Sequence, residues 1–357
     1  MDQLEKMMKD LSEANGVPGF EREVRTKMEQ YLAPLSEEIL RDRMGGIVAK
    51  KTGDANGPRI LLAGHLDEIG FMVTRITDNG FLRFQQLGGW WSHNLLGHRV
   101  TVQSRKGDHI GIIGSKALHA LGADEKNRLL DLKEMFIDVG AKSRAEVEEM
   151  GIRLGDPVVP ASDFFTMRNG EWWCGKALDN RAGCALAVEV LRQLQGESHP
   201  NTIYAGATVQ EEVGLRGAGA LAHLVQPDIA FALDVGLAYD TPGFENYPAQ
   251  VDMGEGPCLF LMDHFMIGHG KLRDLVLDTA EELGIRVQLD ALMGGGTDGG
   301  KFHLHGIGCP TVTIGFPTRY VHSHNSVMAR RDFEQALQLV TAVVKKLDTR
   351  FLEEIVY

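Results

Sequence analysis

Hydrophobic and polar positions follow two different rhythms along the chain. From about residue 161 onward, apolar runs such as "TIYAGATV" and "DIAFALD" alternate with amphipathic stretches such as "RGAGALAHLV" and "KLRDLVLDTAEELG". Continuous apolar runs are typical of strands that are buried on both faces, and the stretches between them have the spacing of helices. This alternation predicts an α/β domain built around a mostly parallel sheet.

The first 67 residues fit the same domain. Two amphipathic helices are predicted, in "MDQLEKMMKDLSEANG" and "EREVRTKMEQYL", followed by a hairpin in "EEILRDRMGGIVAKK" with Gly45 and Gly46 at its turn. The run "PRILLAGHLD" then predicts another buried strand. We therefore expect a discontinuous α/β domain that comprises residues 1–67 and 159–357.

Residues 68–158 have a different pattern of hydrophobic and polar positions. Short alternating stretches such as "GFMVTRI", "HRVTVQS" and "HIGIIGSK" are separated by Gly, Asp and Asn, with one helical piece in "SRAEVEEMG". Period-2 alternation over short runs is the pattern of half-buried strands. The segment is predicted to be a small β-barrel-like domain inserted into the α/β domain.

Composition and net charge disfavour some classes of function. Over 357 residues the hydrophobic content is 43% and the net charge is −12. That charge disfavours a nucleic-acid binder and docking on anionic membranes. The N-terminus lacks the features of a signal peptide, and four scattered cysteines show no disulfide or metal spacing, so a reducing cytoplasm is expected.

Residues with coordinating side chains recur at the predicted strand ends. In open α/β sheets, ligands bind beyond the carboxyl ends of the strands. A further acid precedes the helix that begins in "DNRAGC". The candidates are His65, Asp67, Asp179, Glu211, Glu212, Asp234 and His322.

Each candidate alone has a simpler explanation. Asp179 could be a helix N-cap, Asp234 could begin a turn, and Glu211–Glu212 could lie in a solvated loop. A lone histidine is usually structural, and "HSH" at His322 and His324 could be a surface loop. It is the recurrence at one edge of the sheet that favours a common site.

Two imidazoles with three carboxylates form a ligand set for two divalent ions that share one bridging carboxylate. Such a pair polarises a carbonyl and lowers the pKa of a water. One carboxylate of the Glu211–Glu212 pair is then left free to act as a general base. Asp67 is placed in the sequence to hydrogen-bond His65 and to fix its tautomer.

An ordered set of motifs resembles a known family. The fragments "AGHLDEIGFMV", "ALDNRAGC", "VQEEVGLRGAG", "ALDVG" and "RYVHSH" are similar to those of the M42 metallo-aminopeptidases, which include glutamyl and tetrahedral aminopeptidases. The resemblance spans the whole chain, including "LLGHRV" and "GIRLGDPVVP" in the predicted insertion.

The resemblance implies a role for each candidate residue. His65 and Asp234 would bind one metal, Glu212 and His322 would bind the other, and Asp179 would bridge the two. The same resemblance makes Glu211 the general base, with Asp67 orienting His65. Zinc and cobalt are the expected ions, with manganese as a third candidate.

The resemblance also implies a substrate and an assembly. The expected activity is removal of N-terminal residues from short peptides. Asp298 is a candidate for holding the substrate ammonium, and "MGGGTDGGKF" would line the cleft. Dimers formed through the β insertion would build a dodecameric homo-oligomer. His93 and His98 are expected to affect the assembly surface or the cleft rim, and Trp90 and Trp91 are expected to be packing or interface aromatics.

A glycoside hydrolase of the endoglucanase type is the alternative, because glycoside hydrolases also use a pair of carboxylates for catalysis. It would have no need of His65 and His322 at strand ends, and cellulose binding would favour more than the 7% aromatic residues present. A serine hydrolase is disfavoured, because no G-x-S-x-G motif occurs.

Overall fold

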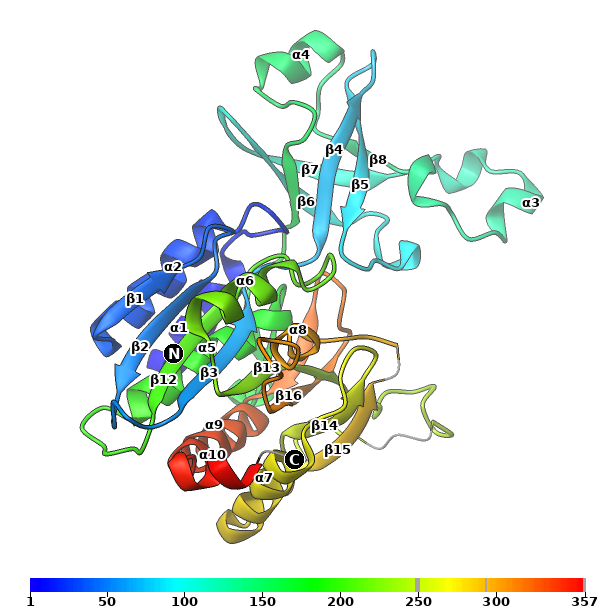
Figure 1. Cartoon of the computed structure of the whole chain (residues 1–357). Coiled ribbons are helices and arrows are strands. Elements are labelled where there is room, and N and C mark those ends of the chain that lie inside the picture. The colour runs from blue at the N-terminus through cyan, green and yellow to red at the C-terminus, as the bar shows by residue number, and fades with distance from the viewer. Residues whose placement is uncertain (248–250, 293, 356–357) are drawn as a thin grey trace.

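The computed structural model describes residues 1–247, 251–292 and 294–355 and places a large mixed sheet at the centre of the molecule (Figure 1). The sheet has 11 strands. Along the sheet they run in the order β1 (Glu38–Arg41), β2 (Ile47–Thr52), β12 (Thr202–Thr208), β3 (Arg59–His65), β13 (Ile229–Leu237), β16 (Thr311–Arg319), β17 (Ser326–Ala329), β11 (Trp172–Gly175) and β10 (Phe165–Met167). Two more strands, β14 (Cys258–Asp263) and β15 (Gln288–Leu292), join through β16.

The middle of the sheet is parallel and most of the flanking pairs are antiparallel, although β14 and β15 pair in parallel. Strand β3 pairs in parallel with β12 and β13, and β13 pairs in parallel with β16. The flanking pairs β1–β2, β14–β16 and β16–β17 are antiparallel. Parallel neighbours bring their carboxyl ends to the same edge, so the candidate residues that follow β3, β12 and β16 are directed to one place.

Helices cover both faces of the sheet. Ile60 and Leu62 of β3 face one layer, and the alternate residues Leu61 and Ala63 face the other. The first layer contains α1 (Gln3–Glu13), α2 (Arg22–Leu32), α5 (Leu178–Gln193), α7 (Gly270–Leu283), α9 (Arg330–Val344) and α10 (Thr349–Ile355). The second layer contains α6 (Arg216–Val225) and α8 (Gly299–Phe302).

Helix α5 lies unusually close to the central strands. A Cβ atom on Gly64 of β3 would come within 2.7 Å of the backbone nitrogen of Cys184, and one on Gly183 would come within 2.2 Å of the Leu233 carbonyl oxygen. Only glycine permits this approach. The close packing brings the first turn of α5, which contains Asp179, toward the end of β3.

A closed six-stranded barrel projects from the edge of the sheet at which β3 ends (Figure 1). Around the barrel its strands are β4 (Gly70–Ile76), β5 (Phe81–Leu87), β8 (Phe136–Asp138), β7 (Gly107–Gly114), β6 (Arg99–Ser104) and β9 (Pro157–Pro160). Its own core includes Phe71, Leu82 and Ile137, and α4 (Arg144–Glu149) contributes Val147. The short helix α3 (Ala123–Lys126) lies on an arm that extends away from the barrel between β7 and β8.

The first and last strands of the barrel are partners. Phe71 of β4 lies opposite Val158 of β9, and Met72 lies opposite Pro157. The chain therefore leaves the α/β domain and returns to it at nearly the same point. The predicted fold class, an α/β domain with an inserted barrel, is confirmed, and the sheet is mixed beyond its parallel centre.

All four cysteines are buried and free. Within the described ranges, no helix is both long and apolar enough to span a lipid bilayer.

Candidate metal centre

Five separate parts of the chain supply the candidate residues at this edge of the sheet. His65 is the last residue of β3, and Glu211 and Glu212 follow β12. Asp179 lies in the first turn of α5, and His322 follows β16. Asp234 differs from its sequence prediction: β13 does not end there but continues to Leu237.

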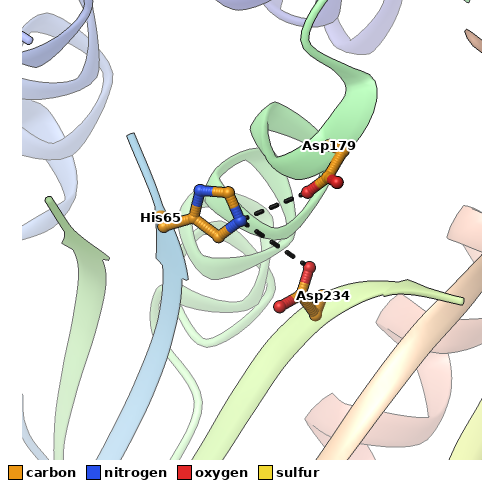
Figure 2. A group of neighbouring side chains, drawn as sticks. All are labelled: His65, Asp179 and Asp234. Atoms are coloured by element: carbon orange, nitrogen blue, oxygen red, sulfur yellow. Dashed lines mark ion pairs between the residues drawn. The ribbon is translucent and has the colours of Figure 1, made fainter. Parts of the chain in front are cut away.

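The first group of ligands is formed by His65, Asp179 and Asp234 (Figure 2). The Nε2 atom of His65 lies 3.2 Å from a carboxylate oxygen of Asp179 and 3.9 Å from one of Asp234. All three side chains point toward a common centre between β3, β13 and α5. One ligand atom from each lies within 4.8 Å of the others, which is the spread of a metal site.

A second group shares Asp179 with the first. The Nε2 atom of His322 lies 3.4 Å from the other carboxylate oxygen of Asp179 and 3.2 Å from Glu212. Asp179 thus faces His65 with Oδ1 and His322 with Oδ2. His322, rather than His324, is the histidine that belongs to this group. The two groups have the arrangement of a pair of sites bridged by one carboxylate.

Several residues of the cluster have left-handed backbone conformations. The φ angle is 60° at His322, 56° at Gln210, directly before the glutamate pair, and 54° at Ala177, two residues before Asp179. Such angles are uncommon outside glycine and cost free energy that the surrounding structure must supply. The surrounding structure therefore holds the backbone in these conformations, which direct the nearby side chains.

The barrel also contacts the second group. A Cβ atom on Gly88 would lie 3.3 Å from Cβ of Glu212, and one on Gly89 would lie 3.1 Å from Nδ1 of His322. These two glycines follow β5, so the inserted domain forms one wall beside His322.

Asp67 positions both the histidine and the glutamate pair. Its carboxylate accepts hydrogen bonds from the backbone N–H groups of Glu211 and Glu212, both at 3.0 Å. Nδ1 of His65 lies 3.0 Å from the Asp67 backbone carbonyl and 3.7 Å from its carboxylate. The backbone of Asp67, more than its side chain, is therefore placed to orient His65, and the carboxylate holds the Glu211–Glu212 loop.

Burial shifts the pKa values of the ionisable side chains in the cluster. Burial, together with the charges of Asp234, Asp298 and Glu212, holds the pKa of Glu211 well above its usual range. Burial likewise raises the pKa of Glu212 and of Asp234. Burial opposes the charge on His65 too, but the surrounding carboxylates, with Glu211 foremost, raise its pKa.

The cluster fits divalent cations. Among the described residues, the carboxylates of Asp179, Glu211, Glu212 and Asp234 form ion pairs only with His65 and His322, and with no lysine or arginine. Oε1 of Glu212 is buried without a hydrogen-bond partner. Buried carboxylates that lack a counter-ion are costly, and imidazole–carboxylate sets are typical ligands for divalent metals.

Sequence reasoning missed two residues that support the site. Nδ2 of Asn180 donates to the Leu233 carbonyl at 2.8 Å, and this bond ties the Asp179 turn to β13 beside Asp234. Nε of Arg181 donates to the Leu66 carbonyl at 2.8 Å, between His65 and Asp67. Both residues stand in the motif "ALDNRAG", from which only Asp179 was selected because amides and arginines are not metal ligands.

The remaining candidates lie outside the ligand cluster. His324 is buried, its ring stacks on that of His98 with centroids 4.1 Å apart, and burial lowers its pKa to about 3. Nε1 of Trp90 donates to the Gly70 carbonyl, and Trp91 lies beside His93. Asp298 is buried, accepts a hydrogen bond from Thr208 and is not among the residues that line the cleft at the site.

Comparison with known proteins identifies the family. The profile of the M42 glutamyl aminopeptidases matches residues 45–339. The chain belongs to this family. The aminopeptidase named FrvX of Escherichia coli strain K12 is 39% identical over 96% of this chain and 95% of its own. The glutamyl aminopeptidase of Lactococcus lactis subsp. cremoris is 36% identical over 98% of each chain.

Solved structures agree. A TET aminopeptidase from a marine sediment archaeon of the Thaumarchaeota has a TM-score of 0.97 and is 44% identical over the full length of both chains. Another structure, labelled an endoglucanase of Thermotoga maritima, is 26% identical with a TM-score of 0.78, so that label is attached to the same fold. This M42 protein is therefore a peptide hydrolase of the metal-dependent aminopeptidase class.

Proposed function

We propose that the chain holds two divalent ions and uses them to remove N-terminal residues from short peptides. The observation that supports this most strongly is the pair of three-residue groups that share Asp179 through its two carboxylate oxygens. His65 and Asp234 would bind one ion, and Glu212 and His322 the other. Bound there, the two ions would polarise the scissile carbonyl and lower the pKa of a water.

Glu211 is the proposed general base. It lies beside the ligands and lines the cleft, with Oε2 3.8 Å from Nε2 of His65, yet it belongs to neither ligand group. Its carboxylate would take a proton from the attacking water and deliver it to the leaving amine.

The substrate ammonium must bind near these residues. Asp298 accepts a hydrogen bond from Thr208 with Oδ2 and is not among the residues that line the cleft, which makes it the weaker candidate. The lining acids Glu211, Glu212 and Asp234 replace it as candidates. Zinc and cobalt remain the proposed ions and manganese a third candidate, since imidazole and carboxylate ligands suit all three.

A pair of amide substitutions tests the two glutamates. Glu211→Gln keeps the shape of the side chain but cannot accept a proton, so kcat should fall by about 10²–10⁴ while both ions stay bound. Glu212→Gln should instead lose affinity for one ion, and excess metal should restore part of the activity. Near-normal turnover in Glu211→Gln, measured together with metal occupancy, would refute the general-base role.

We also infer that the chain assembles into a dodecamer built from dimers. A peptidase of Pyrococcus horikoshii, 30% identical over 97% of this chain and 100% of its own with a TM-score of 0.86, can assemble into a tetrahedron or a large octahedral shell. Light scattering tests the assembly, and a monomer at working concentration would contradict it.

We also infer a location in the cytoplasm. The four thiols are free and buried, which is usual in a reducing compartment.

A further inference from the structure

The cleft beside the metal cluster has a charged end and an apolar end. It encloses about 500 Å³. The charged end is the ligand cluster itself, with Glu211. The rest of the lining is largely aliphatic and aromatic, with Leu237, Tyr239, Tyr247, Phe265 and Leu292.

Cations are missing from this lining. Among the described residues that line the cleft there is no lysine or arginine, and the carboxylates are those of the metal cluster. A ligand group placed at the apolar end would find neither a counter-ion for a carboxylate nor an acid of its own for an ammonium. Transfer of an unpaired charge into such surroundings is strongly unfavourable.

A tight turn presents Phe265 to the cleft. Asp263, at the end of β14, is buried, and its Oδ1 accepts hydrogen bonds from the backbone N–H groups of Phe265 and Met266 at 2.7 and 2.8 Å. Its Oδ2 accepts from the hydroxyl of Thr297 at 3.0 Å. The same carboxylate thus joins the Phe265 turn to the end of the glycine-rich loop. With 53% of its surface exposed, the Phe265 side chain is available to a ligand.

Glycines make room for that ring. A Cβ atom on Gly296 would lie 2.2 Å from the Phe265 ring, and one on Gly300 would lie 2.6 Å from Phe265 Cβ. On the opposite side of the loop, a Cβ atom on Gly295 would lie 3.2 Å from Leu292. The glycines of the segment "GGGTDGG" therefore form a backbone surface against which two apolar side chains are packed, and the hydroxyl of its Thr297 is hydrogen-bonded to Asp263.

Aromatic rings complete the wall. Tyr239 and Tyr247 are stacked with centroids 4.7 Å apart, and Phe244 meets both rings edge-on. Tyr239 is buried, whereas Tyr247 is 48% exposed. The stack gives a rigid apolar border that can cover a hydrocarbon side chain.

We propose that this apolar end receives the side chain of the first substrate residue and selects large uncharged residues such as leucine, methionine and phenylalanine. The proposal rests on the aminopeptidase function above. It runs against the specificity that the glutamyl name of the family would suggest, because the described lining offers a glutamate side chain no lysine or arginine as a counter-ion and places the acids of the cluster nearby. Lysine is intermediate, since its charge is desolvated but is not repelled.

A substrate panel tests the selection. Coumarin amides of leucine, phenylalanine, lysine and glutamate are compared at equal metal loading, each with its N-acetylated counterpart. The kcat/KM for leucine or phenylalanine should exceed that for glutamate by at least about 100-fold, as expected when a pocket lacks a partner for a buried polar group. Equal or faster hydrolysis of the glutamate or lysine substrate would overturn the specificity while leaving the aminopeptidase function intact.

Different results would contradict the proposed aminopeptidase function itself. Failure to hydrolyse any free-amine substrate, or equal hydrolysis of the N-acetylated set, would contradict it. Calorimetric binding of leucine amide and glutamic acid α-amide to the metal-loaded protein would still decide the specificity, because it does not require turnover. Tighter binding of the leucine compound supports the proposal, and equal or weaker binding refutes it.

Two variants test which part of the cleft determines the substrate specificity. Leu292→Arg places a cation at the apolar end and should shift the glutamate-to-leucine ratio of kcat/KM upward by at least about 10-fold. Leu304→Arg is the matched control, because Leu304 is 65% exposed and does not line the cleft, so its ratio should not change. If Leu292→Arg misfolds, Phe265→Ala gives a second reading: it should lower the preference for phenylalanine over alanine. An unchanged preference in a folded Phe265→Ala protein would refute the assignment.

Discussion

At the scale of single residues, Glu211 and Glu212 show how two adjacent like charges can be accommodated. Their backbone N–H groups share the carboxylate of Asp67, which fixes the loop. Their side chains then diverge, since Glu212 faces His322 and Glu211 lies nearer His65. The backbone directly before the pair is left-handed, with φ 56° at Gln210.

The shared carboxylate predicts a joint loss of metal. Because Asp179 faces both histidines, Asp179→Ala should reduce the metal content from about two ions per chain to near zero. Elemental analysis of the purified variant measures this directly. One ion bound with normal affinity would contradict the bridging role. Asp278→Asn, on the exposed face of α7, serves as the control and should keep both ions.

Asp67 should matter for stability as well as for activity. Asp67→Asn removes one of two acceptors for charge-assisted hydrogen bonds, so the free energy of unfolding should fall by about 2 kcal/mol. The loosened loop should lower kcat more than it changes KM. Urea unfolding and steady-state kinetics test both effects. Asp278→Asn should remain within about 0.5 kcal/mol of the natural protein, and an equal loss in both variants would remove the special role of Asp67.

The sequence predicted the ligand candidates more readily than their support. Histidines and carboxylates at strand ends stand out by residue type, so all seven candidates could be named and the structure brings them to one edge. Asn180 and Arg181 act through backbone carbonyls, which no residue pattern reveals. The end of β13 was misplaced because Asp234 interrupts an apolar run although the strand itself continues.

At the scale of elements, long periodic segments were predictable and several short strands were not. The predicted helix in "RGAGALAHLV" is α6 residue for residue, and the hairpin turn at Gly45–Gly46 joins β1 and β2. Strands β10, β11 and β17 have three or four residues, too few for a period to be recognised. Strands β14 and β15 extend the sheet through contacts that are distant in sequence.

Helix α9 should give the protein a pH-dependent stability. Asp332 in its first turn is fully buried and accepts hydrogen bonds from Gly254 and Gly256, and burial raises its pKa from 3.8 to about 6. The folded state therefore holds this proton more tightly than the unfolded chain does. The stability that it contributes is complete below about pH 4 and is lost as the pH rises through about 6.

The test compares the natural protein with Asp332→Asn across pH. The difference in unfolding free energy should move by up to ~3 kcal/mol in favour of Asp332→Asn between pH 4 and pH 7. Urea unfolding at several pH values in that interval measures the slope. Asp278→Asn provides the exposed control, with no such slope. A difference that stays constant with pH would show that Asp332 is not the source.

At the scale of the whole molecule, the barrel and the catalytic sheet meet at the second ligand group. Gly88 and Gly89 lie against Glu212 and His322, and Trp90 contacts His324. The barrel has its own core, separate from the helices that cover the sheet. It should therefore influence activity without being required for the fold of the α/β domain.

Removal of the barrel tests this division. Replacing residues 71–158 with a short glycine–serine linker should leave an α/β domain that unfolds cooperatively, because the two ends of the segment are strand partners. The truncated chain should form smaller species and hydrolyse peptides poorly, since His322 loses its wall. Light scattering, thermal unfolding and kinetics report on the three effects. Full activity in a monomeric truncation would separate the barrel from both roles.

The pairing of β4 with β9 has a consequence for how such a protein can change over time. The insertion begins and ends at neighbouring positions of one ladder within the barrel, so the rest of the chain meets it at a single place. A gene could therefore gain, lose or exchange this segment without shifting the register of β3 or moving His65. Variation within the segment would then reach the ligand cluster through the wall that Gly88 and Gly89 form beside Glu212 and His322.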